Sequence, residues 1–226
     1  MHALILADGD APTRAELDRV WPAWDEGVGL VVAADGGARH AKGLGVRIDR
    51  WVGDGDSIAD VALQALVQEG VLVVRAQPDK DESDTELAVL SALAAGARRI
   101  TIVGALGGLR LDHGLANVAL LALPELAGIA VRIVTGTTRI RLLTGSLPGG
   151  APVPCDLPGR IGDLVSLLPL GGDVLGVTTA GLLYPLVDDT LRLARTRGLS
   201  NIRVAATARV IVQSGRLLII EAPATL

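Results

Sequence analysis

Arg50-Trp51-Val52-Gly53-Asp54-Gly55-Asp56-Ser57 is the stretch that decides the fold, because a short apolar run ends there in an acidic loop. The run Val71-Leu72-Val73-Val74 repeats the pattern and leads to Asp79-Lys80-Asp81-Glu82-Ser83-Asp84. If both runs are parallel strands, their carboxyl ends lie side by side and the carboxylates converge on one crevice. Carboxylates so close repel one another unless a cation lies between them, and Mg²⁺ prefers oxygen ligands. The two stretches therefore predict a magnesium site and suggest phosphoryl or pyrophosphoryl transfer.

The same acidic residues have a simpler interpretation as helix caps. Asp56 or Ser57 could cap a helix that begins near Ile58, and Ser83 or Asp84 could cap the next one. A cap needs one carboxylate, whereas the two loops together supply five aspartates. For the set as a whole, a metal site is the favoured interpretation.

The first part of the chain alternates apolar runs with stretches long enough for crossover helices. Thr13-Arg14-Ala15-Glu16 has the spacing of a capping box that opens one such helix. The alternation predicts a doubly wound, mainly parallel α/β sheet over residues 1–136. The expected strands are Ala3–Ala7, Val28–Ala34, Trp51–Gly53, Val71–Arg75, Ile100–Val103 and Val131–Val134.

After about Gly136 the helical stretches give way to short strands separated by proline and glycine. This texture predicts a smaller all-β, sandwich-like domain over residues 137–226. Ser214-Gly215 has the composition of a two-residue hairpin turn, and the proline-rich stretch 147–158 is typical of a long loop. The expected strands are Ile140–Leu143, Leu164–Leu168, Val174–Thr179, Ile202–Ala206, Val210–Gln213 and Leu217–Glu221.

Composition excludes several classes of protein. Half of the 226 residues are hydrophobic and none is Phe, so the core consists mainly of Ala, Val, Leu and Ile. A net charge of −4 without any basic run argues against nucleic acid as a partner. Cys155 is the only cysteine, which excludes an intrachain disulfide and a cysteine-based zinc site. No segment approaches the roughly 18 apolar residues of a membrane span. A soluble, cytoplasmic protein is expected.

Asp35-Gly36-Gly37 closes the second expected strand. Paired glycines allow a backbone to approach a ligand closely, and Asp35 could bind a hydroxyl or an amine. The alternative is a tight turn before the next helix.

The loop after the fifth expected strand carries Arg110, Asp112 and His113. It brings a fixed positive charge, a carboxylate and an imidazole to the edge where the acidic loops are expected, and Arg110 is suited to a phosphate. The alternative is a surface ion pair between Arg110 and Asp112, with His113 in the first turn of a helix. The neighbouring acidic loops favour the functional interpretation.

Taken together, these motifs resemble the thiamine pyrophosphokinase family. The order and spacing of the motifs over nearly the whole chain carry the resemblance. The matching stretches are Ala34-Asp35-Gly36-Gly37-Ala38, Gly53-Asp54-Gly55-Asp56-Ser57-Ile58, Asp79-Lys80-Asp81-Glu82-Ser83-Asp84, Arg110-Leu111-Asp112-His113 with Leu115-Ala116-Asn117, Thr179-Ala180-Gly181-Leu182-Leu183-Tyr184-Pro185-Leu186 and Ser200-Asn201.

The resemblance implies an α/β catalytic domain that binds ATP and Mg²⁺, a β-sandwich that binds thiamine, and a homodimer with active sites shared between subunits. It also implies pyrophosphoryl transfer from ATP to the hydroxyl of thiamine, giving thiamine diphosphate and AMP. Asp54, Asp56 and Asp84 would hold Mg²⁺, and Asp81 or Asp112 would orient the hydroxyl. Substrate and ATP contacts would come from Asp35, Gly36, Gly37, Lys80, Arg110, His113, Asn117, Tyr184, Ser200 and Asn201.

Two other functions stay open at this point. One is a pyrophosphokinase that acts on a different hydroxymethyl compound, such as a pterin. The other is a regulator that binds a nucleotide or thiamine without turnover. AMP formation from ATP, with and without thiamine, separates the three.

Overall fold

The computed structural model describes residues 1–146 and 150–224. The chain divides into two compact units, Met1–Gly136 and Thr137–Leu226. Among the helices of the described residues, none has the length and apolar character needed to cross a membrane.

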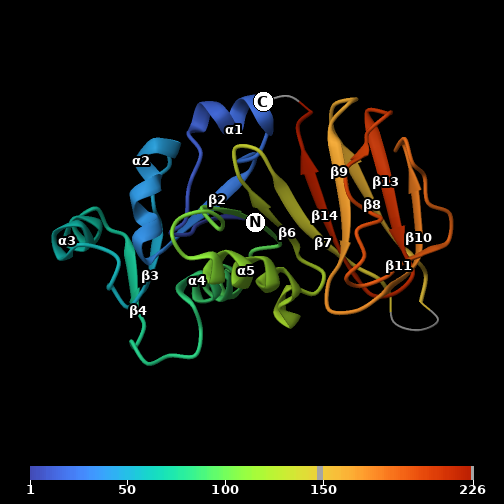
Figure 1. Ribbon diagram of the computed structural model, residues 1–226. Helices are drawn as coiled ribbons and strands as arrows, with labels where there is room; N and C mark the ends of the chain where they lie inside the picture. Colours follow the sequence, from blue (N-terminus) through green and yellow to red (C-terminus); the bar gives the residue numbers. More distant parts are fainter. Residues whose placement is uncertain (147–149, 225–226) are drawn as a thin grey trace. The chain divides into compact units, whose positions relative to one another are not determined.

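The first unit contains a parallel sheet whose strands follow the order β6-β5-β1-β2-β3-β4. Figure 1 labels β2, β3, β4 and β6 of this sheet. Every adjacent pair in this order is parallel. The order reverses at β1, so a crevice forms where the loops after β1 and its neighbours diverge. The strands are β1 His2–Leu6, β2 Val28–Ala34, β3 Arg50–Gly53, β4 Leu72–Arg75, β5 Arg99–Val103 and β6 Ala130–Val134. The predicted doubly wound sheet is confirmed.

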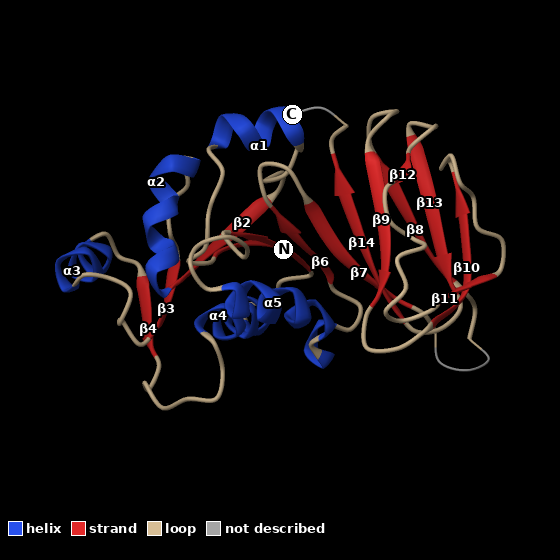
Figure 2. Cartoon of the chain, viewed as in Figure 1, coloured by secondary structure: helices blue, strands red, loops and turns tan. Residues whose placement is uncertain are grey.

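Helices cover both faces of this sheet, with α1 and α2 on one side and α4 and α5 on the other (Figure 2). Coverage on both faces explains why β1 is buried along its whole length and consists almost entirely of apolar residues. The helical segments are α1 Arg14–Val20, η1 Asp35–His40, α2 Ala41–Leu44, α3 Asp60–Gln68, α4 Asp84–Ala94, α5 Leu111–Ala119, η2 Leu120–Ala122 and η3 Pro124–Leu126.

Some of the predicted helix caps are present in the structure and others are not. Thr13 and Glu16 form the predicted capping box, with each side chain accepting from the other residue's backbone amide at 3.3 and 2.7 Å. Ser83 caps α4 by accepting from the Glu86 amide at 3.2 Å. The N-cap residue of helix α3 is Ala59, and no side chain caps this helix, so neither Asp56 nor Ser57 serves that purpose.

The described residues of the second unit form strands and no helix. One group of antiparallel strands has the order β12-β9-β14-β7 and a separate sheet has the order β11-β10-β13-β8. Their inner faces share one apolar core that includes Leu157, Val177 and Leu217. The strands are β7 Arg139–Thr144, β8 Val153–Pro158, β9 Leu164–Pro169, β10 Val174–Ala180, β11 Asp189–Leu191, β12 Asn201–Ile202, β13 Thr207–Val212 and β14 Arg216–Ala222.

Three local predictions in this unit were wrong. Ser214-Gly215 does not close a hairpin, because β13 pairs with β8 and β10 whereas β14 pairs with β7 and β9. The predicted loop 147–158 contains β8, an edge strand in which proline is tolerated, while residues 147–149 lie outside the described residues. The strand expected at Ile202–Ala206 is limited to Asn201–Ile202.

Candidate metal and phosphate site

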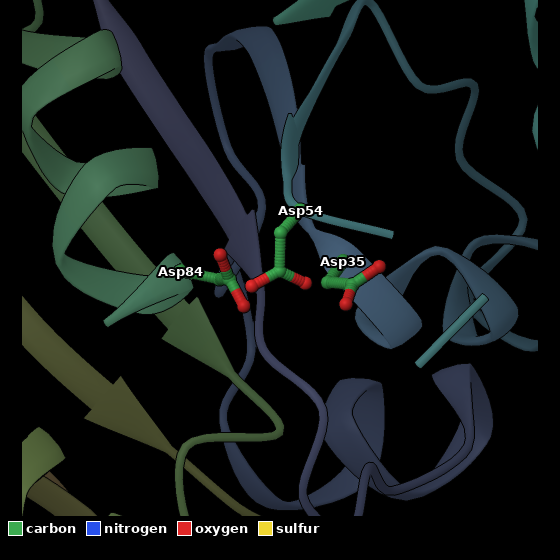
Figure 3. Close-up of side chains that lie close together, drawn as sticks. All are labelled: Asp35, Asp54 and Asp84. Carbon is green, nitrogen blue, oxygen red and sulfur yellow. The ribbon is translucent and has the colours of Figure 1, made fainter. Parts of the chain in front are cut away.

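Three carboxylates from consecutive strand ends meet at one edge of the first unit's sheet. Asp35 follows β2, Asp54 follows β3, and Asp84 opens α4 after β4. One oxygen of each lies within 4.8 Å of the others. Figure 3 shows Asp54 between Asp35 and Asp84. Because β2, β3 and β4 are parallel neighbours, their carboxyl ends share this edge, which the sequence predicted for β3 and β4.

Asp35 is the buried member of this acidic group, with 2% of its surface exposed. Its Oδ2 accepts from the Ser57 amide at 3.0 Å, while Oδ1 is buried and has no hydrogen-bond partner among the described residues. Burial raises the pKa of Asp35 to about 6. The Ser57 amide opposes this rise, whereas the carboxylates of Asp56 and Asp84 add to it. A carboxylate held in this way favours the approach of a cation.

Lys80 already supplies one positive charge to the acidic group. Its Nζ lies 2.8 Å from Oδ2 of Asp54 and 3.0 Å from Oδ1 of Asp84. The hydrogen bond from Lys80 lowers the pKa of Asp54, whereas burial raises the pKa of Asp84 despite the same ammonium group. Burial lowers the pKa of Lys80, but its bonds to both carboxylates outweigh this effect and raise that pKa overall.

The donor set fits a hard divalent cation. One ammonium cannot neutralise three carboxylates, and the buried Oδ1 of Asp35 offers a free oxygen beside Asp54 and Asp84. Closely spaced carboxylate oxygens are the ligands that Mg²⁺ prefers in proteins.

Asp56 occupies a different position from the one the sequence suggested. Its side chain is exposed, and its Oδ1 accepts from the Ser57 hydroxyl at 2.8 Å. Gly55 adopts φ +90°, and this turn directs the Asp56 amide toward Oδ1 of Asp54 at 3.1 Å. The third carboxylate beside Asp54 and Asp84 is therefore that of Asp35, and Asp56 lies on the exposed side of this group.

Gly36 and Gly37 allow η1 to pack against β1. A Cβ on Gly36 would lie 2.3 Å from Oδ1 of Asp8, and a Cβ on Gly37 would lie 2.1 Å from the carbonyl oxygen of Leu6. Backbone atoms exclude any side chain at Gly37, whereas at Gly36 the Asp8 side chain would have to move. Close packing is therefore an alternative to the predicted substrate contacts of these glycines.

The loop after β1 also reaches this edge, and sequence reasoning missed it. Arg39 donates to the carboxylate and the carbonyl of Asp8, and Nε2 of His40 lies 2.9 Å from the carbonyl oxygen of Gly9. The signal was present, because Asp8-Gly9-Asp10 follows the buried β1 after Ala7, at the point where strand order reverses.

Arg110 and Asp112 form the surface pair that the sequence had left as the alternative. Nη2 of Arg110 lies 2.6 Å from Oδ2 of Asp112, and the two side chains are 66% and 64% exposed. The guanidinium lowers the pKa of Asp112. His113 is exposed in the first turn of α5, and Asp81 is exposed in the acidic loop after β4. The potential metal group among the described residues includes none of these four residues.

Asn117 and Asn201 are buried and bind backbone. Nδ2 of Asn117 donates to the carbonyl of Ala105 at 2.8 Å, which holds the loop after β5. Asn201 accepts from the Tyr184 amide at 3.0 Å and donates to the Tyr184 carbonyl at 2.7 Å. Tyr184 itself is 66% exposed. Ser200 is exposed at φ +56°, and its amide donates to Oγ of Ser166 at 3.0 Å.

Two family models match the chain, one in each unit. Residues 23–133 match the thiamin pyrophosphokinase catalytic domain, and residues 154–218 match the thiamin pyrophosphokinase vitamin B1 binding domain. Among curated proteins, the chain is similar to the thiamine pyrophosphokinase of Bacillus subtilis (strain 168). The two are 28% identical over 169 residues, which cover 75% of this chain and 76% of the relative.

Solved structures share the fold. The crystal structure of the thiamin pyrophosphokinase of Geobacillus thermodenitrificans superposes with a TM-score of 0.79 at 26% identity, covering 100% of this chain and 99% of that one. The B. subtilis thiamine pyrophosphokinase gives a TM-score of 0.81 at 24% identity, with 99% of each chain covered. The Candida albicans thiamin pyrophosphokinase shares the fold at 17% identity, with a TM-score of 0.78, covering 98% of this chain and 88% of that one.

Proposed function

Because this chain belongs to the thiamin pyrophosphokinase family, we propose that its acidic group of Asp35, Asp54 and Asp84 holds Mg²⁺ for pyrophosphoryl transfer. The chain is an ATP-dependent transferase that moves a pyrophosphoryl group to the hydroxyl of thiamine, giving thiamine diphosphate and AMP. The observation that supports the metal assignment is the convergence of three carboxylates on one point, with a buried oxygen of Asp35 left free.

A divalent ion at this edge would offset the charge of the triphosphate. Lys80 lies beside Asp54 and Asp84, so its ammonium is placed to stabilise phosphate oxygens once these carboxylates bind a metal. Asp56 would complete the ligand set from its exposed position. Asp81 or Asp112 would orient the thiamine hydroxyl, with His113 nearby in sequence.

Arg110 is proposed to bind a phosphate after leaving Asp112. Their ion pair is exposed on both sides, and exposed pairs contribute little to stability. A triphosphate can therefore displace Asp112 from Arg110 at little cost. Asn117 would act indirectly, by holding the loop that carries Arg110.

The second unit is proposed to supply the thiamine pocket. Tyr184 has an exposed ring, and Asn201 binds the backbone amide and carbonyl of Tyr184. Ser200 precedes Asn201 in a strained left-handed turn. We further propose a cytoplasmic homodimer with shared active sites. The observation in favour of a dimer is the set of large apolar side chains exposed between residues 183 and 204, namely Leu183, Tyr184, Val187, Leu193, Leu199 and Val204.

The central test is AMP formation from ATP, with thiamine, with a hydroxymethyl pterin and without acceptor, each in Mg²⁺ and in chelator. We expect AMP only with thiamine and metal. Asp54→Asn should abolish it, and Asp60→Asn, at an exposed aspartate in the first turn of α3, is the matched control. AMP formation in chelator, or equal turnover of Asp54→Asn and Asp60→Asn, would refute the metal assignment. Preference for the pterin would refute the substrate.

The dimer needs a separate measurement. Light scattering at micromolar protein should give twice the chain mass of 23.2 kDa. A monomer that is fully active would exclude shared sites.

A further inference from the structure

A cavity of about 450 Å³ lies within the second unit, and no residue of the proposed catalytic or thiamine site lines it. Its walls come from the end of β9, from β11 and from the segment that follows β11. The apolar wall consists of Leu167, Pro169 and Leu191, and the rest is formed by Thr190, Arg192, Arg195, Thr196, Arg197 and Gly198. The volume lies in the range of small-molecule sites.

Three arginines line this cavity, and two of them carry uncompensated charge. Arg197 is bound by Asp189, with Nη1 at 2.9 Å from Oδ1. The side chains of Arg192 and Arg195 form no hydrogen bond or ion pair with any residue in 1–146 or 150–224. Asp173, which also binds this segment, accepts the amide of Leu193 at 2.8 Å. The cavity is therefore locally positive in a chain whose net charge is −4.

The backbone holds this segment in place. Leu167 donates to the carbonyl of Gly198 at 2.8 Å, and a Cβ on Gly198 would lie 2.1 Å from the carbonyl oxygen of Leu167. The Arg195 amide donates to the Arg192 carbonyl at 3.2 Å, which closes a turn through Ala194 at φ +59°. A non-glycine residue adopts that region at an energetic cost and persists there only where the surroundings impose it. Arg192 and Arg195 are therefore presented from a defined turn.

We propose that this cavity binds the phosphate or diphosphate group of a small organic ligand. Guanidinium groups match phosphate oxygens with paired hydrogen bonds, and the hydroxyls of Thr190 and Thr196 add donors at the same wall. The apolar wall accommodates the uncharged part of such a ligand. Thiamine itself is cationic, so two unpaired arginines would repel it. The cavity consequently selects a phosphorylated compound, such as a nucleotide or thiamine diphosphate, over free thiamine.

Calorimetric titration of the full chain in chelator tests this site, because without metal the acidic group of the first unit repels phosphates. The probes are inorganic pyrophosphate, AMP and thiamine diphosphate, which separate the anion alone from its two organic sources. The test variant is Arg192→Gln with Arg195→Gln. The matched control is Arg160→Gln with Arg209→Gln, which removes the same charge from exposed arginines of the same unit that do not line the cavity.

We expect at least one probe to bind wild type and the control equally, and the test variant to bind it about tenfold or more weakly. Binding of none of the probes, or equal weakening in both double variants, would overturn the proposal. AMP formation is measured on the same preparations. Normal turnover by a wild-type protein that binds no probe in chelator would overturn this site and leave the proposed function intact.

Discussion

Asp35→Asn is expected to stabilise the metal-free protein while it destroys the activity. Asn retains the shape of Asp and tolerates the φ of +41° that Asp35 adopts. A pKa raised from 3.8 to about 6 corresponds to about 3 kcal/mol of destabilisation by the buried carboxylate at neutral pH. This figure already includes the bond from the Ser57 amide, and water around the neighbouring, exposed Asp56 screens part of it. The net gain is about 2 kcal/mol.

The sign follows from linkage. The folded-state pKa of Asp35 lies above the unfolded value, so this group destabilises the fold increasingly as pH rises from 3.8 to about 6, and fully above that. The advantage of Asp35→Asn over wild type should therefore be greatest near pH 7.5 and nearly vanish near pH 4.

Thermal unfolding in chelator measures this difference. For a chain of this size, 2 kcal/mol corresponds to about 4–8 °C in Tm. Mg²⁺ should raise the Tm of wild type, leave that of Asp35→Asn almost unchanged, and support turnover about 100-fold lower or worse in the variant. Asp60→Asn serves as control, since it removes an exposed charge. A variant less stable than wild type at pH 7.5, or one with an undiminished Mg²⁺ response, would refute the reasoning.

Three further changes probe other parts of the chain. Asp56→Asn should lower turnover about tenfold or more without changing Tm, because its carboxylate is exposed; near-normal turnover at saturating Mg²⁺ would exclude it as a ligand. Asn201→Ala should raise the KM for thiamine more than that for ATP, because it leaves the Tyr184 backbone unpaired; equal changes in steady-state kinetics would separate it from the pocket. Glu221→Gln should lower the free energy of unfolding, measured in urea, by about 3–5 kcal/mol, since the buried carboxylate neutralises three arginines. A loss below about 1 kcal/mol would contradict that role. These arginines are Arg139, Arg141 and Arg203.

The sequence by itself determined the strands of the first unit and the loops that carry its chemistry. Apolar runs that end in acidic residues are local signals, and β3 and β4 lie within one residue of the predicted strands Trp51–Gly53 and Val71–Arg75. The capping box at Thr13 is likewise local, because its two hydrogen bonds join residues three apart. Asp54 and Asp84 could be assigned to a common edge because each lies in an acidic loop that follows such an apolar run.

Only the tertiary structure decided which distant groups meet. Asp35 joins Asp54 and Asp84 because β2 pairs with β3, a contact that no local pattern contains. Ser214-Gly215 has the composition of a hairpin turn, yet long-range pairing sends β13 and β14 to different partners. The arginines of the second unit's cavity likewise share that cavity with residues of β9, which lies more than twenty residues earlier in the chain. Local patterns specify which face of an element is buried, whereas strand neighbours and converging side chains depend on the total burial and pairing of the whole chain.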